Sequence, residues 1–199
     1  MERPGSIILV GSAHPFRGGL ASFNERLVRQ FGTDGVDARI LTFTTQYPSL
    51  VFPGTTQYSA EPVPRDLRID RCVSSLYPGS WWRVGRQIRR ERPDVLLFKY
   101  WLPFFGPCFG AIARLARGNG HTRVLAIADN IIPHEARLGD KALTRYFLKP
   151  VDGMLVMSRT VANQVDGLAP GLPTVYCPHP LFDNFGPPCS RLESLRHLE

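Results

Sequence analysis

A glycine-bearing segment follows the first apolar run of the chain. Residues 11–20 read GSAHPFRGGL, and a helical pattern begins where the segment ends. The N–H groups at a helix N-terminus are unpaired and lie at the positive end of the helix dipole, and glycines let a ligand approach the backbone closely. We therefore interpret His14, Arg17, Gly18 and Gly19 as a candidate phosphate or diphosphate site. A tight turn that binds nothing is the alternative for the two glycines.

This segment is not one of the better-known phosphate loops. The chain contains no GxGxxG, and no GxxxxGK followed by Ser or Thr. The second apolar run ends in Thr44 and Thr45, without the acidic residue that would bind an adenosine ribose. A nicotinamide dinucleotide is therefore disfavoured.

A polar cluster, DNIIPHE, occupies residues 129–135 directly after the fifth apolar run. We interpret Asp129 and His134 as candidate catalytic residues, because a carboxylate can orient a hydroxyl or act as a base and an imidazole transfers protons near neutral pH. Asn130 and Glu135 are candidate ligands for sugar hydroxyls. Turn capping by the first two residues and a solvent-facing Glu135 are the alternatives.

Two further segments carry candidate binding residues. Lys99 and Trp101 open the aromatic stretch KYWLPFFGP, whose rings suit stacking on a sugar or a lipid-linked acceptor, or else fill the space under a neighbouring domain. Ser158 precedes a helical pattern, where it either caps the helix or helps to bind ligand at a second helix N-terminus.

The elements that must position these residues alternate between short apolar runs and helical patterns. The predicted strands are residues 6–11, 38–43, 69–73, 95–100, 124–128, 154–157 and 174–177. Helical periodicity lies between the first two runs, in residues 81–92, and after the fourth and sixth runs. This alternation predicts an α/β fold: a Rossmann-like, doubly wound, mostly parallel sheet of about seven strands with helices on both faces. Residues 44–67 have no clear period and predict an irregular excursion.

Composition narrows the class of protein. The chain has 199 residues and a formal charge of +7, which favours acidic partners such as phosphorylated ligands, nucleic acid or an anionic membrane. Its 4 cysteines form no CxxC pair and no zinc-like cluster, so we expect reduced thiols and no metal site. No apolar run is long enough for a signal peptide or a membrane span, so we expect a soluble, cytoplasmic protein.

Residues 81–92, WWRVGRQIRRER, place tryptophans and arginines on a short amphipathic helix. Such a helix can lie on an anionic bilayer at the inner membrane face, although a helix packed on the sheet with solvated arginines is the alternative.

Taken in order, these segments resemble the N-terminal domain of the family 4-like glycosyltransferases of GT-B architecture. The resemblance rests on residues 14–19, 101–105, 129–135, 157–158 and 179–186. It implies one Rossmann-like domain over residues 1–186 and a tail over 187–199 whose last two residues look vector-derived. The family's C-terminal, donor-binding domain would be absent, and the isolated chain would be inactive.

The resemblance implies transfer of a hexose from a nucleoside-diphosphate sugar to a saccharide or lipid-linked acceptor, as in polysaccharide biosynthesis. It also implies retention at the anomeric carbon and no metal or cofactor other than the donor. Gly18 and Gly19 would lie near the diphosphate, and Asp129, Asn130 and His134 near the reacting sugar. Many members place a histidine where this chain has Asp129.

The alternative is a non-enzymatic Rossmann-like module that binds a phosphorylated or nucleic-acid ligand. The charge supports it, but no nucleic-acid-binding motif is recognisable. A Rossmann enzyme such as an epimerase is disfavoured, because the chain lacks GxGxxG and a Tyr-xxx-Lys pair.

Overall fold

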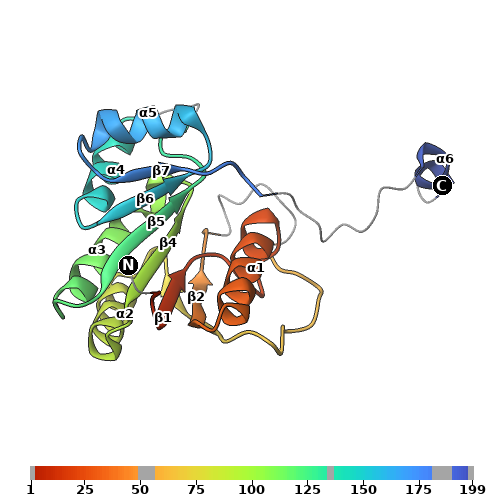
Figure 1. Ribbon diagram of the computed structural model, residues 1–199, viewed down its shortest axis with the longest axis horizontal. Helices are drawn as coiled ribbons and strands as arrows, with labels where there is room; N and C mark the ends of the chain where they lie inside the picture. Colours follow the sequence, from red (N-terminus) through yellow and green to blue (C-terminus); the bar gives the residue numbers. More distant parts are fainter. Residues whose placement is uncertain (1–2, 49–56, 134–136, 181–189, 197–199) are drawn as a thin grey trace.

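The computed structural model describes residues 3–48, 57–133, 137–180 and 190–196 of the chain. Seven parallel strands form one sheet in the order β3-β2-β1-β4-β5-β6-β7 (Figure 1). Their bounds are β1 Ser6–Val10, β2 Asp37–Thr45, β3 Ile69–Ser74, β4 Val95–Tyr100, β5 Arg123–Ala128, β6 Gly153–Val156 and β7 Thr174–Tyr176. The predicted α/β Rossmann-like sheet is confirmed, and every strand lies within two residues of its predicted bounds.

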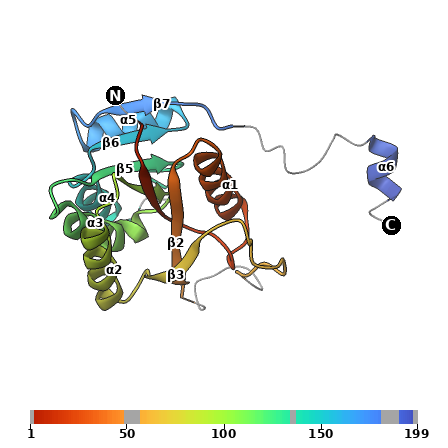
Figure 2. The same ribbon diagram turned by 60° about the horizontal axis from the view of Figure 1, so that its bottom comes forward.

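Helices cover the two faces of this sheet unequally. The helices are α1 Gly19–Thr33, α2 Pro78–Glu91, the 3-10 turn η2 Pro103–Phe105, α3 Gly106–Arg117, α4 Asp140–Leu148, α5 Arg159–Leu168 and α6 Arg191–Arg196. Figure 2 shows α1 on one side of the sheet and α2 and α3 on the other. The connection from β1 to β2, which contains α1, runs one way across the sheet, and the connections that contain α2 to α5 run the other way. Because crossovers between parallel strands are right-handed, α1 lies on one face and α2 to α5 lie on the other.

Two hydrophobic cores result from this arrangement. Alternate residues of each strand point to opposite faces, so Ile8 and Val10 pack toward α2–α5 while Ile7 and Leu9 pack toward α1. The core on the α2–α5 side is the larger and includes the stacked rings of Tyr100 and Phe147, 4.6 Å apart.

Two helices were not predicted. The helix α4 is short and follows Gly139, which makes no side-chain cap, so it carries no start signal beyond its acidic first residue. The six-residue α6 falls in the segment that we interpreted as a polar tail, and it lies apart from the sheet in Figure 1.

The strand order reverses between β1 and β4. These two strands are neighbours in the sheet, and their pairing partners Val10 and Phe98 are 88 positions apart in the sequence. The loops that follow β1 and β4 therefore leave the same sheet edge in opposite directions. In open α/β sheets, ligands bind in the crevice at such a point. This edge, the carboxyl edge, is where the candidate residues lie.

Candidate functional site

The loop after β1 is fixed by side chains from two neighbouring elements. The Thr42 hydroxyl of β2 accepts a hydrogen bond from the Ala13 N–H at 3.0 Å, and the Glu25 carboxylate of α1 accepts one from the His14 N–H at 2.8 Å. These bonds use two of the backbone donors in the first half of the loop. The donors at the start of α1 lie further along, after Gly18.

The start of α1 has the open geometry of an anion site. Gly18 precedes the helix with φ 110° and ψ 174°, a conformation that favours glycine, and no side chain caps the helix. The first turn contains no acidic residue, and Arg17, Gly18 and Gly19 are exposed. The first-turn N–H groups have no partner within the helix, so they are available to a ligand.

A segment of the β2–β3 connection packs against this loop from outside. The Arg17 N–H donates to the Gln57 carbonyl at 3.0 Å, and the Ser59 N–H donates to the Pro15 carbonyl at 2.8 Å. His14 Nε2 lies 3.2 Å from the Glu61 carbonyl oxygen. The side chain of His14 is thus held beside the loop. The predicted irregular excursion includes this ordered contact.

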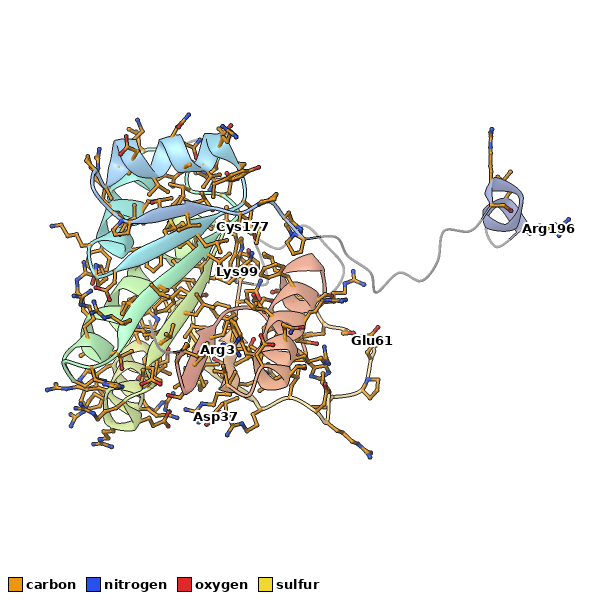
Figure 3. The ribbon with its side chains drawn as sticks, in the orientation of Figure 1. Arg3, Asp37, Glu61, Lys99, Cys177 and Arg196 are labelled. Atoms are coloured by element: carbon orange, nitrogen blue, oxygen red, sulfur yellow. The ribbon has the colours of Figure 1, made fainter. Side chains whose placement is uncertain are left out.

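At the centre of the carboxyl edge, Lys99 and Asp129 form an ion pair. Lys99 Nζ lies 2.6 Å from Asp129 Oδ1, and the Lys99 side chain is only 1% exposed, against 29% for Asp129. The ammonium also lies 3.8 Å from the centroid of the Phe23 ring of α1. Figure 3 shows Lys99 inside the molecule, near α1. Burial lowers the pKa of Lys99, and the Asp129 carboxylate partly offsets this by raising it.

Gly11 and Asn24 complete this buried group, and the sequence analysis did not select either. A Cβ atom on Gly11 would lie 2.6 Å from Asn24 Nδ2 and 3.1 Å from Lys99 Cβ, so only glycine fits there. Asn24 Nδ2 donates to the Ser12 carbonyl at 2.8 Å, while Asn24 Oδ1 is buried with no hydrogen-bond partner among the described residues. An asparagine on the apolar face of a helix was the available signal.

Hydrogen bonds tie the start of the segment after β5 to β4, and β4 in turn to α4. The Asp129 N–H donates to the Tyr100 carbonyl at 3.1 Å, and Tyr100 Oη lies 2.9 Å from Thr144 Oγ1 of α4. Burial raises the pKa of the Tyr100 phenol. Asn130 is partly buried beside Asp129. His134 and Glu135 lie outside the described residues.

Trp101 belongs to a packed aromatic group. Its side chain is 8% exposed, its ring centroid lies 4.3 Å from that of Phe105, and its indole N–H donates to the Tyr47 hydroxyl at 2.7 Å. The ring is therefore engaged within the protein, beside the edge.

Ser158 caps α5, because its hydroxyl accepts a hydrogen bond from the Val161 N–H at 3.1 Å. The capping alternative for this residue is thus observed directly.

Three strand ends meet at the carboxyl edge: Gly11 directly follows β1, Lys99 is the penultimate residue of β4, and Asp129 directly follows β5. We call this part of the edge the rim. The ring of His179, after β7, lies 5.6 Å from that of Phe23. Among the described residues, no group of three His, Cys, Asp or Glu side chains could hold a metal ion. A hollow of about 490 Å³ between α1 and the Asp66–Arg68 segment lies at the opposite edge of the sheet.

Comparison with known proteins identifies the fold. The chain is similar to solved structures of an α-glucosyltransferase: one in complex with UDP and a 13-mer DNA containing a HMU base (9% identity, TM-score 0.59, 88% of this chain, 42% of that one), and one in complex with UDP (10% identity, TM-score 0.53, 93% of this chain, 42% of that one). This chain therefore spans less than half the length of these structures. No curated protein sequence matches it.

The model of the glycosyl transferase 4-like domain matches residues 18–174, from the exposed glycines at the start of α1 to the first residue of β7. The matched region contains Lys99, Asp129 and Ser158 and most of the sheet that brings them to one edge. The chain belongs to the glycosyl transferase 4-like domain family.

Proposed function

We propose that this chain is the acceptor-side domain of a glycosyltransferase that transfers a hexose from a nucleoside-diphosphate sugar to a saccharide or lipid-linked acceptor, within polysaccharide biosynthesis. One observation carries the proposal. The uncapped N-terminus of α1 and the Lys99–Asp129 pair lie on the same sheet edge, where the strand order reverses between β1 and β4.

In this proposal, the start of α1 stabilises the leaving diphosphate. The first-turn N–H groups at Gly19 and the positive end of the helix dipole favour the negative charge that develops as the glycosidic bond breaks. Arg17, exposed immediately before Gly18, adds a cation at the same place. These donors are fixed before the ligand arrives, since Thr42 and Glu25 hold the preceding loop.

Asp129 orients a hydroxyl of the reacting sugar or of the acceptor. Its Oδ1 is bound to Lys99, and the second carboxylate oxygen remains to accept a hydrogen bond at the partly exposed face of the residue. Asn130 follows it on the rim and provides both a donor and an acceptor. His134 is proposed to contribute a proton or contact a phosphate.

A partner lobe completes the site in this proposal. The chain matches 42% of the length of the α-glucosyltransferase that binds UDP, so we place most of the donor-binding surface outside these residues and expect the isolated chain to be inactive. We further propose that the reaction retains the anomeric configuration and needs no metal or cofactor besides the donor.

The test is a donor panel on the full-length protein. Turnover of nucleoside-diphosphate hexoses is measured with and without EDTA, and the anomeric configuration of the product is determined by NMR. We expect Asp129→Asn to lower kcat by about 100-fold, and Gly18→Ala to weaken donor binding by about tenfold. Gly167→Ala, a helical glycine with open space around it, is the matched control and leaves both values unchanged.

Unchanged turnover in both site variants would refute the site. If no sugar nucleotide is turned over and the protein instead binds nucleic acid in a salt-dependent way, the non-enzymatic alternative holds in its place.

A further inference from the structure

An exposed apolar group lies at the start of α2. Leu76 and Tyr77 immediately precede the helix and are 49% and 64% exposed, and Trp82 in its second turn is 56% exposed. A single exposed apolar side chain is ordinary, but three within seven residues indicate a surface that binds a membrane or another molecule.

The outer side of the same helix is strongly positive. Arg83, Arg86 and Arg90 are exposed, and the Arg86 guanidinium lies 4.6 Å from the centroid of the Trp82 ring. The acidic residue of α2, Glu91, is ion-paired with Arg39. No unpaired carboxylate of this helix therefore opposes the arginines.

The helix is held rigidly on the protein, so these side chains keep a fixed orientation. The Trp81 indole N–H donates to the Ser74 carbonyl at 2.6 Å, and Ser80 donates to the Tyr77 carbonyl at 2.8 Å. On the inner side, Val84 and Ile88 are fully buried. The helix therefore packs on the protein through this inner side, and its attachment does not depend on the exposed apolar group.

We propose that the α2 surface, which we define as Leu76, Tyr77, Trp82, Arg83, Arg86 and Arg90, docks on an anionic lipid bilayer. Tyrosine and tryptophan favour the headgroup region, where the ring is shielded and the polar atom stays hydrated. Arginines are attracted to anionic headgroups at short range. The contact is peripheral: none of the helices in the described part of the chain is long and apolar enough to cross a bilayer.

A bilayer fits this surface better than a nucleic acid does. Arginines alone would suit a phosphate backbone, and an aromatic ring can stack on an unpaired base. The aliphatic side chain of Leu76, with about half of its surface exposed beside Tyr77, gains nothing from either contact and is stabilised by burial among acyl chains.

The location of the surface gives docking a consequence. The strand β3 ends at Ser74, so Leu76 and Tyr77 lie at the carboxyl edge of the sheet, the edge that carries Asp129. Docking through this surface holds the rim next to the bilayer. If the proposed transferase function is also correct, the acceptor it reaches is a lipid-anchored one.

Binding to vesicles tests docking without any donor or turnover, so its outcome is independent of the proposed reaction. The chain is sedimented with phosphatidylcholine vesicles with and without about 30% phosphatidylglycerol, at about 0.1 M salt. We expect binding to the anionic vesicles only. Brominated lipids should quench tryptophan fluorescence. Trp82→Phe should remove most of the quenching, because Trp101 is buried and Trp81 is only partly exposed, with its indole N–H bound to the Ser74 carbonyl.

Two variants and one control separate the contributions. Arg83→Ala/Arg86→Ala should weaken partitioning by about 30-fold, and Trp82→Ala by about tenfold. The charge-matched control is Arg145→Ala/Lys149→Ala, which removes two exposed cations from the α4 region and should change partitioning by less than about twofold. All these residues are exposed, so folding should be preserved.

Three outcomes would overturn the proposal: no binding to anionic vesicles, an equal loss in the control variant, or no quenching by brominated lipid. Tight binding to duplex or single-stranded DNA that requires Arg83 and Arg86 and competes with the vesicles, without any effect of Trp82→Ala on vesicle binding, would assign the surface to nucleic acid.

Discussion

Removing the Asp129 carboxylate should destabilise the protein far more than removing its partner. Asp129→Ala leaves the ammonium of Lys99 with 1% exposure and no carboxylate within bonding distance. Breaking a fully buried pair in this way costs about 3–5 kcal/mol; because Asp129 is 29% exposed and water can enter the space it leaves, we expect about 2–3 kcal/mol. For a chain of this length the melting temperature should fall by about 4–12 °C.

Lys99→Met should cost only about 1 kcal/mol or less, because methionine keeps the apolar contact with Phe23 and the remaining Asp129 reaches water. The double variant should then be about as stable as Lys99→Met alone. The cost of Asp129→Ala in the wild-type protein minus its cost in the Lys99→Met variant gives the coupling free energy between the two side chains, which we expect to be about 2 kcal/mol.

The cost of Asp129→Ala should also depend on pH. The pKa of Lys99 is lowered in the folded state by burial, so between that value and its unfolded value near 10.5 the unfolded chain binds more protons and stability rises with pH. Without Asp129, the pKa of Lys99 falls further, and the neutral amine is reached at lower pH. The destabilisation should therefore be largest near neutral pH and shrink as the pH rises toward 10.5.

Urea unfolding of the four proteins of this cycle, followed by circular dichroism at several pH values, measures these free energies. Equal costs for the two single variants, or a cost of Asp129→Ala that is the same at pH 7 and pH 10, would refute the buried-pair reasoning.

Three further outcomes follow from other parts of the structure. Gly18→Ala should cost about 1 kcal/mol of stability, since φ is 110° there, whereas Gly167→Ala in α5 should stabilise the chain by about 0.5–1 kcal/mol; chemical denaturation distinguishes them. Ser158→Ala should lose about 1 kcal/mol with its helix cap and Ser158→Asp should retain most of it, as a melting curve would show. At pH 8, iodoacetamide should alkylate the exposed Cys177 quickly, while the partly buried Cys72, whose pKa is raised to about 11 chiefly by burial, should react much more slowly; labelling of the two at equal rates in peptide maps would contradict this difference.

The sheet was predictable because its strands are buried on both faces and read as continuous apolar runs bounded by turn residues. Runs such as residues 95–100 have no plausible place on a surface, and the spacing between runs leaves room for crossover helices. The helix α4 escaped prediction because its buried apolar positions, Phe147 and Leu148, come only at its end, and its other buried residue, Thr144, is polar; the apolar pattern is too short to show a period.

The candidate site was predictable in its location but not in its contacts. Polar residues after buried parallel strands must meet at one edge, so Asp129 and the glycine loop were found. That Lys99 points toward α1 and pairs with Asp129 depends on the register that places Lys99 beside Ile127 and on the position of Phe23, and no local pattern encodes either. Asn24 differs, because a local signal was present: it is polar at a position where the helix period calls for an apolar residue. Its contact with Ser12, however, depends on how α1 packs on the sheet.

The strand order has a consequence for how the chain folds during synthesis. The strand β1 lies between β2 and β4, so one side of it stays unpaired until residues 95–100 have left the ribosome. An unpaired edge of an apolar parallel strand is prone to associate with other chains, and contacts between distant residues form slowly. Nascent chains that end before β4 should therefore be the ones that chaperones retain, and those that include it should be released.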